Sequence, residues 1–303
     1  MHPLYGGNKA RKLTRVLQSL APSPPRRIVT FGTAGSHHVL ATALFAEARA
    51  ISARAILLPE PHTEHVERTF LAILGQRAIT VEPAQTLAHA ALSFASGHRR
   101  GDLVLGPGGA GLPATLAYVD AAQELAGQVR RGLLPSPDEI VVALGTGTTV
   151  AGLLVGLALA GLATRVVAVQ VVGGLGSRWL TLRLAARAAR AVGVASAGLG
   201  MRLCVERGEL GSGYGYPTAA GDAATARAAS TGLALDPTYT AKAFAHALAR
   251  ASQAPFGRVV LYWHTLSSQP LAALTGSSPR LVDLAPSLRG LLRPVSRRAE
   301  TER

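Results

Sequence analysis

The sequence predicts an α/β fold in which parallel-rich sheets are covered by helices on both faces. Short apolar segments alternate along the chain with longer stretches of helical pattern, as in repeated β-α-β units. The apolar segments are continuous runs of valine, isoleucine and leucine, which is typical of strands buried on both sides. The chain has 303 residues, of which 48% are hydrophobic and 16% charged, so it can bury a sizeable core.

The expected elements follow in a regular order from the N-terminal end. A loop-like opening leads to a first helical stretch, and strands and helices then alternate until a charged tail begins at Arg293. We expect strands at 28–31, 55–58, 78–81, 103–105, 140–144, 166–172 and 259–263. We expect helices at 10–20, 39–49, 64–74, 87–96, 113–129, 150–163, 179–192, 225–231 and 240–252. Proline-containing linkers are expected at 21–27 and 131–138.

Composition excludes several classes of protein. The formal charge is +14, but aromatic residues make up only 5% of the chain, so platforms for stacking nucleic-acid bases are scarce and no nucleic-acid partner is expected. The single cysteine, Cys204, rules out an internal disulfide and a cysteine zinc site. The uncharged segment 140–164 is interrupted by glycines and leaves a helix shorter than the roughly 20 residues needed to span a bilayer. We therefore expect a cytoplasmic protein with no membrane partner.

A glycine-rich turn between a buried strand and a helix is the first candidate site. Its backbone N–H groups and threonine hydroxyls, at a helix N-terminus, form a chemical cradle for phosphate. The turn consists of Gly145, Thr146, Gly147, Thr148 and Thr149. It lacks the lysine of a P-loop, and no acidic residue follows the next strand as in dinucleotide folds, so nucleotide hydrolysis and NAD binding are both disfavoured.

Two further turns are chemically suggestive. Lys9 follows two glycines at the start of a helical stretch, where a lysine amine can form an imine with an aldehyde cofactor. Ser36 and its neighbours again form a donor-rich turn at a helix start, which suits a carboxylate. The adjacent His37 and His38 lack the spacing of a metal site, so no metal is expected.

Taken together, the motifs resemble the 1-aminocyclopropane-1-carboxylate deaminase / D-cysteine desulfhydrase family of pyridoxal-phosphate enzymes. That family has the two-lobed tryptophan-synthase-β-like fold, called fold type II. The matching segments, in family order, are 5–13, 35–38, 108–109, 145–149, 214–217, 235–242 and 264–265. The resemblance covers nearly the whole chain, although the segment that usually precedes Gly-Gly-Asn-Lys in the family, including a strand, is missing from this sequence.

The resemblance implies a role for each matching residue. Lys9 would link covalently to pyridoxal phosphate and move the proton at the substrate's α-carbon, while Ser36 would receive the substrate carboxylate. Tyr214 and Tyr239 would act as acid–base groups beside the substrate. The implied cofactor-binding residues are Lys9, Asn8, His37, Gly145, Thr146, Gly147, Thr148, Thr149, Thr240 and Thr265. The implied domains are 12–115 on the substrate side and 1–11 with 116–303 on the cofactor side, and a homodimer is expected.

Four positions depart from the family pattern. His37 replaces the asparagine that usually faces the cofactor's phenolic oxygen, and Leu266 and Ser267 replace two glycines after Thr265. Thr240 stands where deaminases of the family carry a glutamate near the pyridine nitrogen. A hydroxyl there leaves the ring nearer neutral, which suffices to eliminate a good leaving group but weakens the electron sink that ring opening needs.

The expected activity is therefore α,β-elimination from a small amino acid, of the D-cysteine desulfhydrase type, giving pyruvate, ammonia and sulfide. The alternatives are 1-aminocyclopropane-1-carboxylate deaminase activity, a degenerate relative that binds pyridoxal phosphate without catalysis, and an NAD-binding oxidoreductase.

Overall fold

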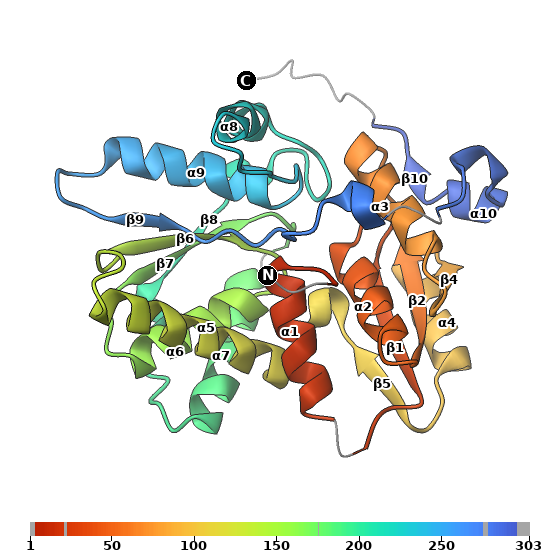
Figure 1. Cartoon of the computed structure of the whole chain (residues 1–303), viewed down its shortest axis with the longest axis horizontal. Coiled ribbons are helices and arrows are strands. Elements are labelled where there is room, and N and C mark those ends of the chain that lie inside the picture. Colours follow the sequence, from red (N-terminus) through yellow and green to blue (C-terminus); the bar gives the residue numbers. More distant parts are fainter. Residues whose placement is uncertain (1–3, 21–22, 175, 275–277, 296–303) are drawn as a thin grey trace. The chain divides into compact units, whose positions relative to one another are not determined.

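The computed structural model describes residues 4–20, 23–174, 176–274 and 278–295. The chain divides into two compact units, which are coloured along the sequence in Figure 1. Unit 1 consists of Met1–Pro25 and Leu105–Gln269, and unit 2 consists of Arg26–Val104 and Pro270–Arg303. Among the described residues, no helix is long and apolar enough to cross a membrane.

Unit 2 is built on a four-stranded sheet in the order β4-β2-β1-β5. Its strands are β1 (Arg27–Thr33), β2 (Ser52–Leu58), β4 (Ile79–Pro83) and β5 (Asp102–Leu105). Strand β2 pairs in parallel with both β1 and β4, as the predicted β-α-β units require. The helices between them are α2 (His37–Glu47), α3 (Glu64–Leu74) and α4 (Leu87–Gly97). Ile56 of β2 packs with Ala90 of α4 in one apolar cluster.

The last part of the chain returns to unit 2. Helix α10 (Pro286–Arg289) precedes β10 (Leu292–Arg293), which pairs in parallel with β3 (Glu60–Pro61). The sequence did not predict these two-residue strands, because they are too short to carry a periodic pattern.

Unit 1 holds the second sheet, in the order β8-β7-β6-β9. Its strands are β6 (Glu139–Leu144), β7 (Arg165–Gln170), β8 (Leu203–Glu206) and β9 (Val260–Tyr262), and every pair among them is parallel. Its helices are α1 (Gly7–Gln18), α5 (Leu112–Arg130), α6 (Thr148–Leu159), α7 (Ser177–Ala191), α8 (Ala219–Ala229) and α9 (Thr240–Gln253). The uncharged segment 140–164 is thus a strand and a helix, as predicted.

Strand alternation explains why both faces of this sheet are covered. Ile140 and Val142 of β6 join the cluster that includes α5 and α6, whereas Val141 between them joins the cluster with Ala243 and Ala247 of α9. Figure 1 shows α5 and α6 on one side of the sheet and α9 on the other. The predicted fold class, with parallel strands between helical layers, is therefore confirmed.

The two units differ from the expected division at their boundaries. Helix α1 belongs to unit 1, where Arg11 pairs with Glu124 of α5 at 2.6 Å and Arg15 pairs with Asp120 at 2.9 Å. Residues 270–303 belong to unit 2 because β10 adds to β3. The expected domains had assigned 12–25 and 105–115 to the substrate side and 270–303 to the cofactor side.

Candidate functional site

Lys9 is the third residue of α1, and the loop after β9 fixes the start of this helix. The backbone N–H of Asn8 donates a hydrogen bond to the Thr265 carbonyl at 3.1 Å. Gly7 has a φ of +56°, and a Cβ there would lie 2.2 Å from the Leu266 carbonyl oxygen. The close approach of the 265–266 backbone therefore requires glycine before Lys9. Asn8, Lys9 and Thr265 are thus brought together, as two segments far apart in the sequence.

The glycine-rich turn joins β6 to α6. Gly147 is the N-cap of α6 with a φ of +83°, and a Cβ on it would lie 2.4 Å from Thr181 Oγ1. The side chains of Thr148 and Thr149 are buried in the first turn of the helix. The Thr146 and Thr148 hydroxyls lie 3.3 Å apart. Because the first turn of a helix leaves backbone N–H groups without intrahelical partners, the turn offers a cluster of donors for an anion.

The lysine and the turn face one backbone position, Gly108. A Cβ on Gly108 would lie 3.2 Å from Thr146 Oγ1 and 3.8 Å from Lys9 Nζ. The backbone at 108 therefore lies close to both groups, and a side chain there would crowd Thr146. The amine and the anion cradle occur in one neighbourhood of unit 1.

Burial changes the chemistry of the Lys9 amine. Desolvation lowers the pKa of Lys9 to about 8, an effect that the negative charge of Asp236 partly offsets. The neighbouring Lys12 is buried too, and burial together with the charge of Lys9 holds its pKa well below the usual range. Lys12 Nζ lies 5.6 Å from the centre of the Tyr118 ring. Lys9 is thus available as a neutral amine near physiological pH.

The two predicted tyrosines form a pair. The Tyr214 and Tyr239 hydroxyls are 2.7 Å apart, and their rings meet edge to face with centroids 5.7 Å apart. A Cβ on Gly145 would lie 3.4 Å from Tyr239 Cε1, so the pair adjoins the glycine-rich turn. The hydroxyl pair provides a proton donor and acceptor on elements separate from Lys9.

Thr240 is engaged by a buried carboxylate. Its hydroxyl donates to Asp236 Oδ2 at 2.5 Å and accepts from the Asp236 backbone N–H at 2.6 Å. Asp236 also accepts from the backbone N–H groups of Tyr239 and Thr240, at 2.7 and 3.2 Å, and so fixes the turn that leads into α9. The single hydroxyl proton of Thr240 is therefore committed to Asp236.

Lys242 fixes the segment that carries Tyr214. Its side chain is fully buried, and Nζ donates to the carbonyls of Leu210 at 3.0 Å and Gly213 at 3.3 Å. The sequence placed Lys242 in the family's helix pattern but did not predict this clamp. The signal that could have found it is the scarcity of lysine, since the chain has three lysines in all.

Ser36 and His37 form a second group, within unit 2. Ser36 caps α2 by accepting the Val39 backbone N–H at 3.4 Å. His37 Nε2 lies 2.8 Å from His65 Nε2, and His65 is the second residue of α3. His65 carries no motif of its own, so the sequence did not predict its place beside His37.

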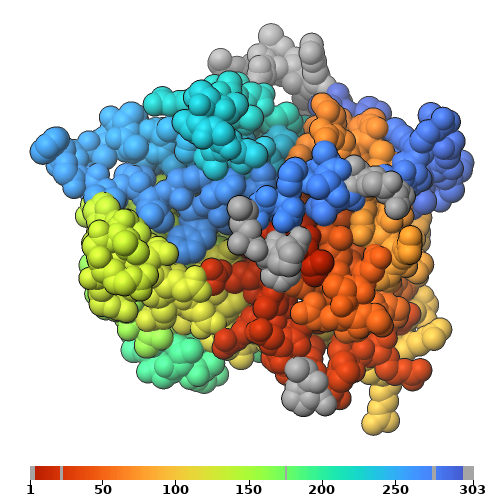
Figure 2. All heavy atoms as spheres, viewed as in Figure 1, coloured from red at the N-terminus to blue at the C-terminus, as the bar shows by residue number. Residues whose placement is uncertain are grey.

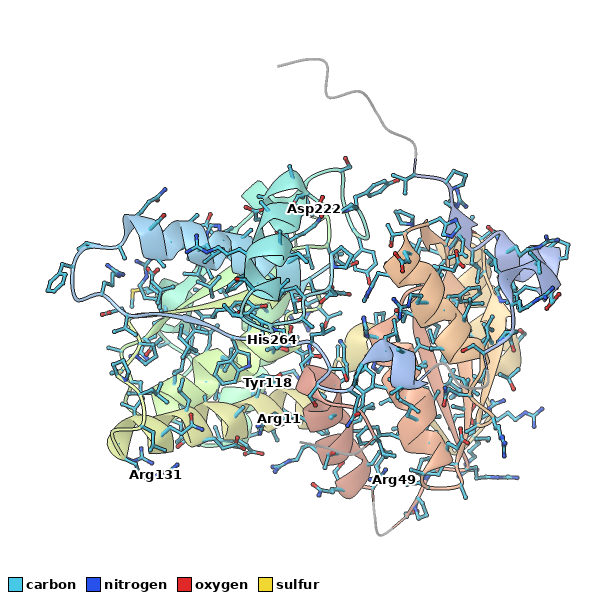
Figure 3. The ribbon with its side chains drawn as sticks, turned by 45° about the horizontal axis from the view of Figure 1, so that its top comes forward. Arg11, Arg49, Tyr118, Arg131, Asp222 and His264 are labelled. Atoms are coloured by element: carbon cyan, nitrogen blue, oxygen red, sulfur yellow. The ribbon has the colours of Figure 1, made fainter. Side chains whose placement is uncertain are left out.

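The outer face of α1 holds a shallow hollow, distinct from Lys9. Its volume is about 590 Å³. It is lined by Arg11, Thr14, Arg15 and Gln18 of α1, Asp120 and Glu124 of α5, and His264 and Leu266 among others. Helical geometry puts these α1 residues opposite Lys9, Leu13 and Val16. Figure 2 shows this face of α1 (red) at the surface beside α5 (yellow-green), and Figure 3 labels Arg11, Tyr118 and His264 in the same region.

Within the described ranges, no cluster of three or more His, Cys, Asp or Glu side chains is arranged to hold a metal ion.

Comparisons with known proteins agree with this donor set. A family model described as pyridoxal-phosphate dependent enzyme matches residues 1–265. The chain is 34% identical over 292 residues to the nocardicin C-9' epimerase of Nocardia uniformis subsp. tsuyamanensis, covering 91% of this chain and 86% of that protein. It is 28% identical over 289 residues to the D-cysteine desulfhydrase of Salmonella choleraesuis, covering 88% and 84%. The crystal structure of an ACC deaminase homologue matches with a TM-score of 0.74 and 27% identity, covering 95% and 85%.

Proposed function

The chain belongs to the family of pyridoxal-phosphate-dependent enzymes, and from this premise we propose that it is a lyase that eliminates a β-substituent from a small amino acid. The proposed reaction is of the D-cysteine desulfhydrase type, in which D-cysteine and water give pyruvate, ammonia and hydrogen sulfide. The observation that carries this proposal is the commitment of the Thr240 hydroxyl to Asp236. Because the chain belongs to this family, its cofactor is pyridoxal phosphate and not a dinucleotide such as NAD.

The residues of unit 1 fit pyridoxal phosphate. Lys9 supplies an amine with a pKa of about 8, which reacts with an aldehyde near neutral pH. The turn at 145–149 supplies a helix N-terminus and threonine hydroxyls for the phosphate. The Gly108 backbone lies close to both groups, which puts the amine and the turn in one neighbourhood.

Each residue then has a defined task. When bound, the cofactor supplies an electron sink that acidifies the proton on the substrate's α-carbon. Lys9 takes that proton, since its lowered pKa makes the amine a base near neutral pH. The Tyr214–Tyr239 pair passes a proton to the leaving thiolate. One tyrosine hydroxyl donates its proton to the thiolate, and the other hydroxyl, 2.7 Å away, then replaces that proton. The start of α2 at Ser36, in unit 2, offers donors suited to a carboxylate, which is the role that the family resemblance implies for this residue.

Thr240 favours elimination over ring opening. Its only proton is held by Asp236, so the hydroxyl has none to donate to a pyridine nitrogen. A thiolate leaves readily without a strengthened electron sink, whereas opening a cyclopropane requires one. 1-Aminocyclopropane-1-carboxylate deaminase activity is therefore the less favoured reaction, although a solved relative is named as a homologue of that enzyme.

Epimerisation at the α-carbon is the second candidate. The relative from Nocardia uniformis, at 34% identity, is named as an epimerase. Epimerisation needs the same proton removal, followed by return of a proton to the opposite side of the carbon. The tyrosine pair, on elements separate from Lys9, provides a second proton donor.

Incubation in deuterium oxide separates these activities. Purified protein with pyridoxal phosphate is supplied with D-cysteine, L-cysteine or 1-aminocyclopropane-1-carboxylate, and sulfide, keto acid and deuterated enantiomers are measured. We expect sulfide and pyruvate in equal amounts from one cysteine enantiomer. Deuterated amino acid of inverted configuration without sulfide would favour epimerisation, and 2-oxobutanoate from the cyclopropane would favour the deaminase.

Lys9→Ala tests the covalent role of the lysine. We expect the variant to lose the violet absorbance of bound cofactor and several orders of magnitude of rate. Lys12 and Lys242 are buried and make poor controls, so the matched control is Arg131→Ala at an exposed position at the end of α5. Retention of the violet absorbance by Lys9→Ala would contradict the assignment, and its absence from the wild type would favour the degenerate-relative alternative.

We also propose a cytoplasmic homodimer, as the family resemblance implies. Sedimentation equilibrium would give twice the 31.2 kDa chain mass, and a monomer would contradict it.

A further inference from the structure

The outer face of α7, in unit 1, carries a row of positive charge that the proposed chemistry does not use. The segment 140–205, which contains this helix, has six arginines and no aspartate or glutamate. Trp179, Arg183, Arg187 and Arg190 are spaced by four, four and three residues, so they share one face of the helix. All four residues are exposed. We call Arg183, Arg187 and Arg190 the arginine stripe.

The charge of the arginine stripe is not neutralised within the described part of the chain. No described carboxylate pairs with any of its three guanidinium groups. On other helices of unit 1 the arginines do have such partners, since Arg11 of α1 pairs with Glu124 and Arg250 of α9 pairs with Glu139. Three like charges along one helix face repel one another, so an anionic partner would lower the electrostatic energy of this face.

An exposed apolar group lies at the N-terminal end of the arginine stripe. The Trp179 side chain is 61% exposed, and the neighbouring Leu180 is exposed too. The guanidinium carbon of Arg183 lies over the Trp179 ring, 4.6 Å from its centre. The stacking holds the indole ring on the outer face and joins the apolar end to the stripe.

A second apolar side chain is held beside the first turn of α7. Arg178 donates to the carbonyls of Gly200 and Leu203, both at 2.7 Å, and thereby ties the turn 199–202 to the helix. Met201 in this turn is 83% exposed. Tryptophan, methionine and arginine are the side chains enriched in protein–protein interfaces, whereas a surface without a partner rarely gathers them.

The buried side of α7 argues against a lipid partner. Ala185, Ala188 and Ala189 pack with Val155 of α6 in one apolar cluster, and Figure 1 shows the two helices side by side. A helix that binds a membrane surface inserts its apolar face, and that face of α7 is occupied by the core. The outer face has a single aromatic ring, which is too few to stack successive nucleic-acid bases.

A second copy of this chain is also a poor partner for the arginine stripe. In a symmetric dimer the same patch of both subunits meets at a two-fold axis. Such a pairing would set arginines against arginines across the interface. The chemistry that complements the stripe is therefore a row of carboxylates on a different protein.

We propose that the arginine stripe and Trp179 form a docking surface for an acidic segment of another protein. The carboxylates of that segment lie along α7, and an apolar side chain at one end packs against Trp179 and Leu180. The surface belongs to unit 1 alone, and the proposal does not depend on the proposed reaction.

The first experiment measures binding of a fluorescently labelled helical peptide of glutamate and alanine with one terminal leucine. The full chain with pyridoxal phosphate is titrated, and anisotropy gives the Kd. We expect binding that weakens with salt, and an affinity about tenfold lower for the triple variant Arg183→Gln/Arg187→Gln/Arg190→Gln, the size expected of three exposed ion pairs. Arg187→Gln alone should cost about twofold, and it tests the proposal if the triple variant does not fold.

The matched control removes the same charge from elsewhere in unit 1. Its three arginines are also exposed and without an ion pair among the described residues, and they are Arg130, Arg131 and Arg227. The triple variant Arg130→Gln/Arg131→Gln/Arg227→Gln should bind the peptide within twofold of the wild type. Equal losses in the two triple variants would show attraction by net charge alone and overturn the proposal, as would the absence of binding to the wild type.

The second experiment tests the apolar end. Trp179→Ala should weaken binding of the leucine-containing peptide several-fold and leave binding of the same peptide without leucine unchanged. Equal losses for both peptides would overturn the role of Trp179. Tighter binding to phosphatidylserine vesicles or duplex DNA than to the peptide, lost in the stripe variant, would assign the surface to another partner. A change in the sedimentation of the stripe variant would assign it to self-assembly, and either result would reject the proposal.

Discussion

Replacing Lys9 with methionine should stabilise the protein without cofactor while abolishing the covalent link. Burial lowers the Lys9 pKa from 10.5 to about 8. A shift of one unit corresponds to about 1.4 kcal/mol, so protonated Lys9 opposes folding by about 3 kcal/mol. The folded state binds this proton more weakly than the unfolded state. The penalty is therefore present in full below pH 8 and disappears as pH rises from 8 to 10.5.

Methionine keeps most of the lysine's volume and removes the charge. Urea unfolding of the cofactor-free protein at pH 7 should give a free energy of unfolding higher by up to about 3 kcal/mol for Lys9→Met. The wild type should gain stability between pH 8 and 10.5, and Lys9→Met should gain less, because only the contribution of Lys12 and Lys242, whose pKa values are also lowered, remains.

Lys9→Arg is the matched control. Its guanidinium stays charged across the whole range, so it should lack the covalent link, show no stabilisation at pH 7 and gain less stability than the wild type between pH 8 and 10.5, where only Lys12 and Lys242 contribute. The reasoning is refuted if wild-type stability is flat over that interval, or if Lys9→Met is no more stable than the wild type at pH 7.

Three other substitutions test contacts within unit 1. Lys242→Met should lower kcat and cost about 1–3 kcal/mol in urea unfolding, because two carbonyls of the Tyr214 segment lose their donor. Gly147→Ala should weaken cofactor binding, measured by absorbance titration, since its Cβ would overlap Thr181. Gly161→Ala is the control, because Gly161 also has a positive φ but no described atom lies within 4 Å of the added Cβ. This variant therefore measures the cost of backbone strain without a side-chain overlap. Burial alone would raise the Glu139 pKa, but the neighbouring Arg250, Arg258 and Arg165 outweigh this effect and lower the pKa. The free energy of unfolding therefore falls as the pH drops below the pKa that Glu139 has in the unfolded chain. Glu139→Gln should flatten that fall in urea unfolding between pH 5 and 3.

Elements with strong local signals were predicted with good bounds. Helix α3 runs from Glu64 to Leu74 as expected, because Thr63 caps it by accepting the Val66 N–H and apolar residues recur on one face. Helix α8 begins at Ala219, earlier than predicted, since Gly221 interrupts the apparent helical pattern. The Thr218 cap, which accepts the Gly221 N–H, is the signal that was overlooked.

Strand β8 shows where a local pattern fails. Leu203–Glu206 is four residues long and lies between Arg202 and Arg207, so no apolar run marks it. It exists because its backbone pairs in parallel with β7. Tertiary pairing of this kind overrides the weak preference of a short segment.

In the candidate site, too, the residues in local motifs were predicted, whereas the contacts between distant segments were not. The glycine-rich turn and Lys9 are visible as local motifs, and the structure puts both beside Gly108. The contacts that tune them are not local: His65 reaches His37 across 28 positions, and Lys242 reaches Leu210 across 32. No spacing rule links such residues, because their proximity is created by the packing of separate helices.

The use of lysine ties these observations together. The chain has 31 basic residues, of which three are lysines; Lys12 and Lys242 are buried, and Lys9 is partly so. Arginine cannot lose its proton in proteins, so it can pair with carboxylates but cannot supply a neutral amine. A buried lysine is costly, and it persists where an amine or a compact donor is required. Apart from the chain's amino terminus, an aldehyde meets few competing amines, so reduction with borohydride should mark Lys9 selectively, and labelling at Lys12 or Lys242 would contradict the covalent role given to Lys9.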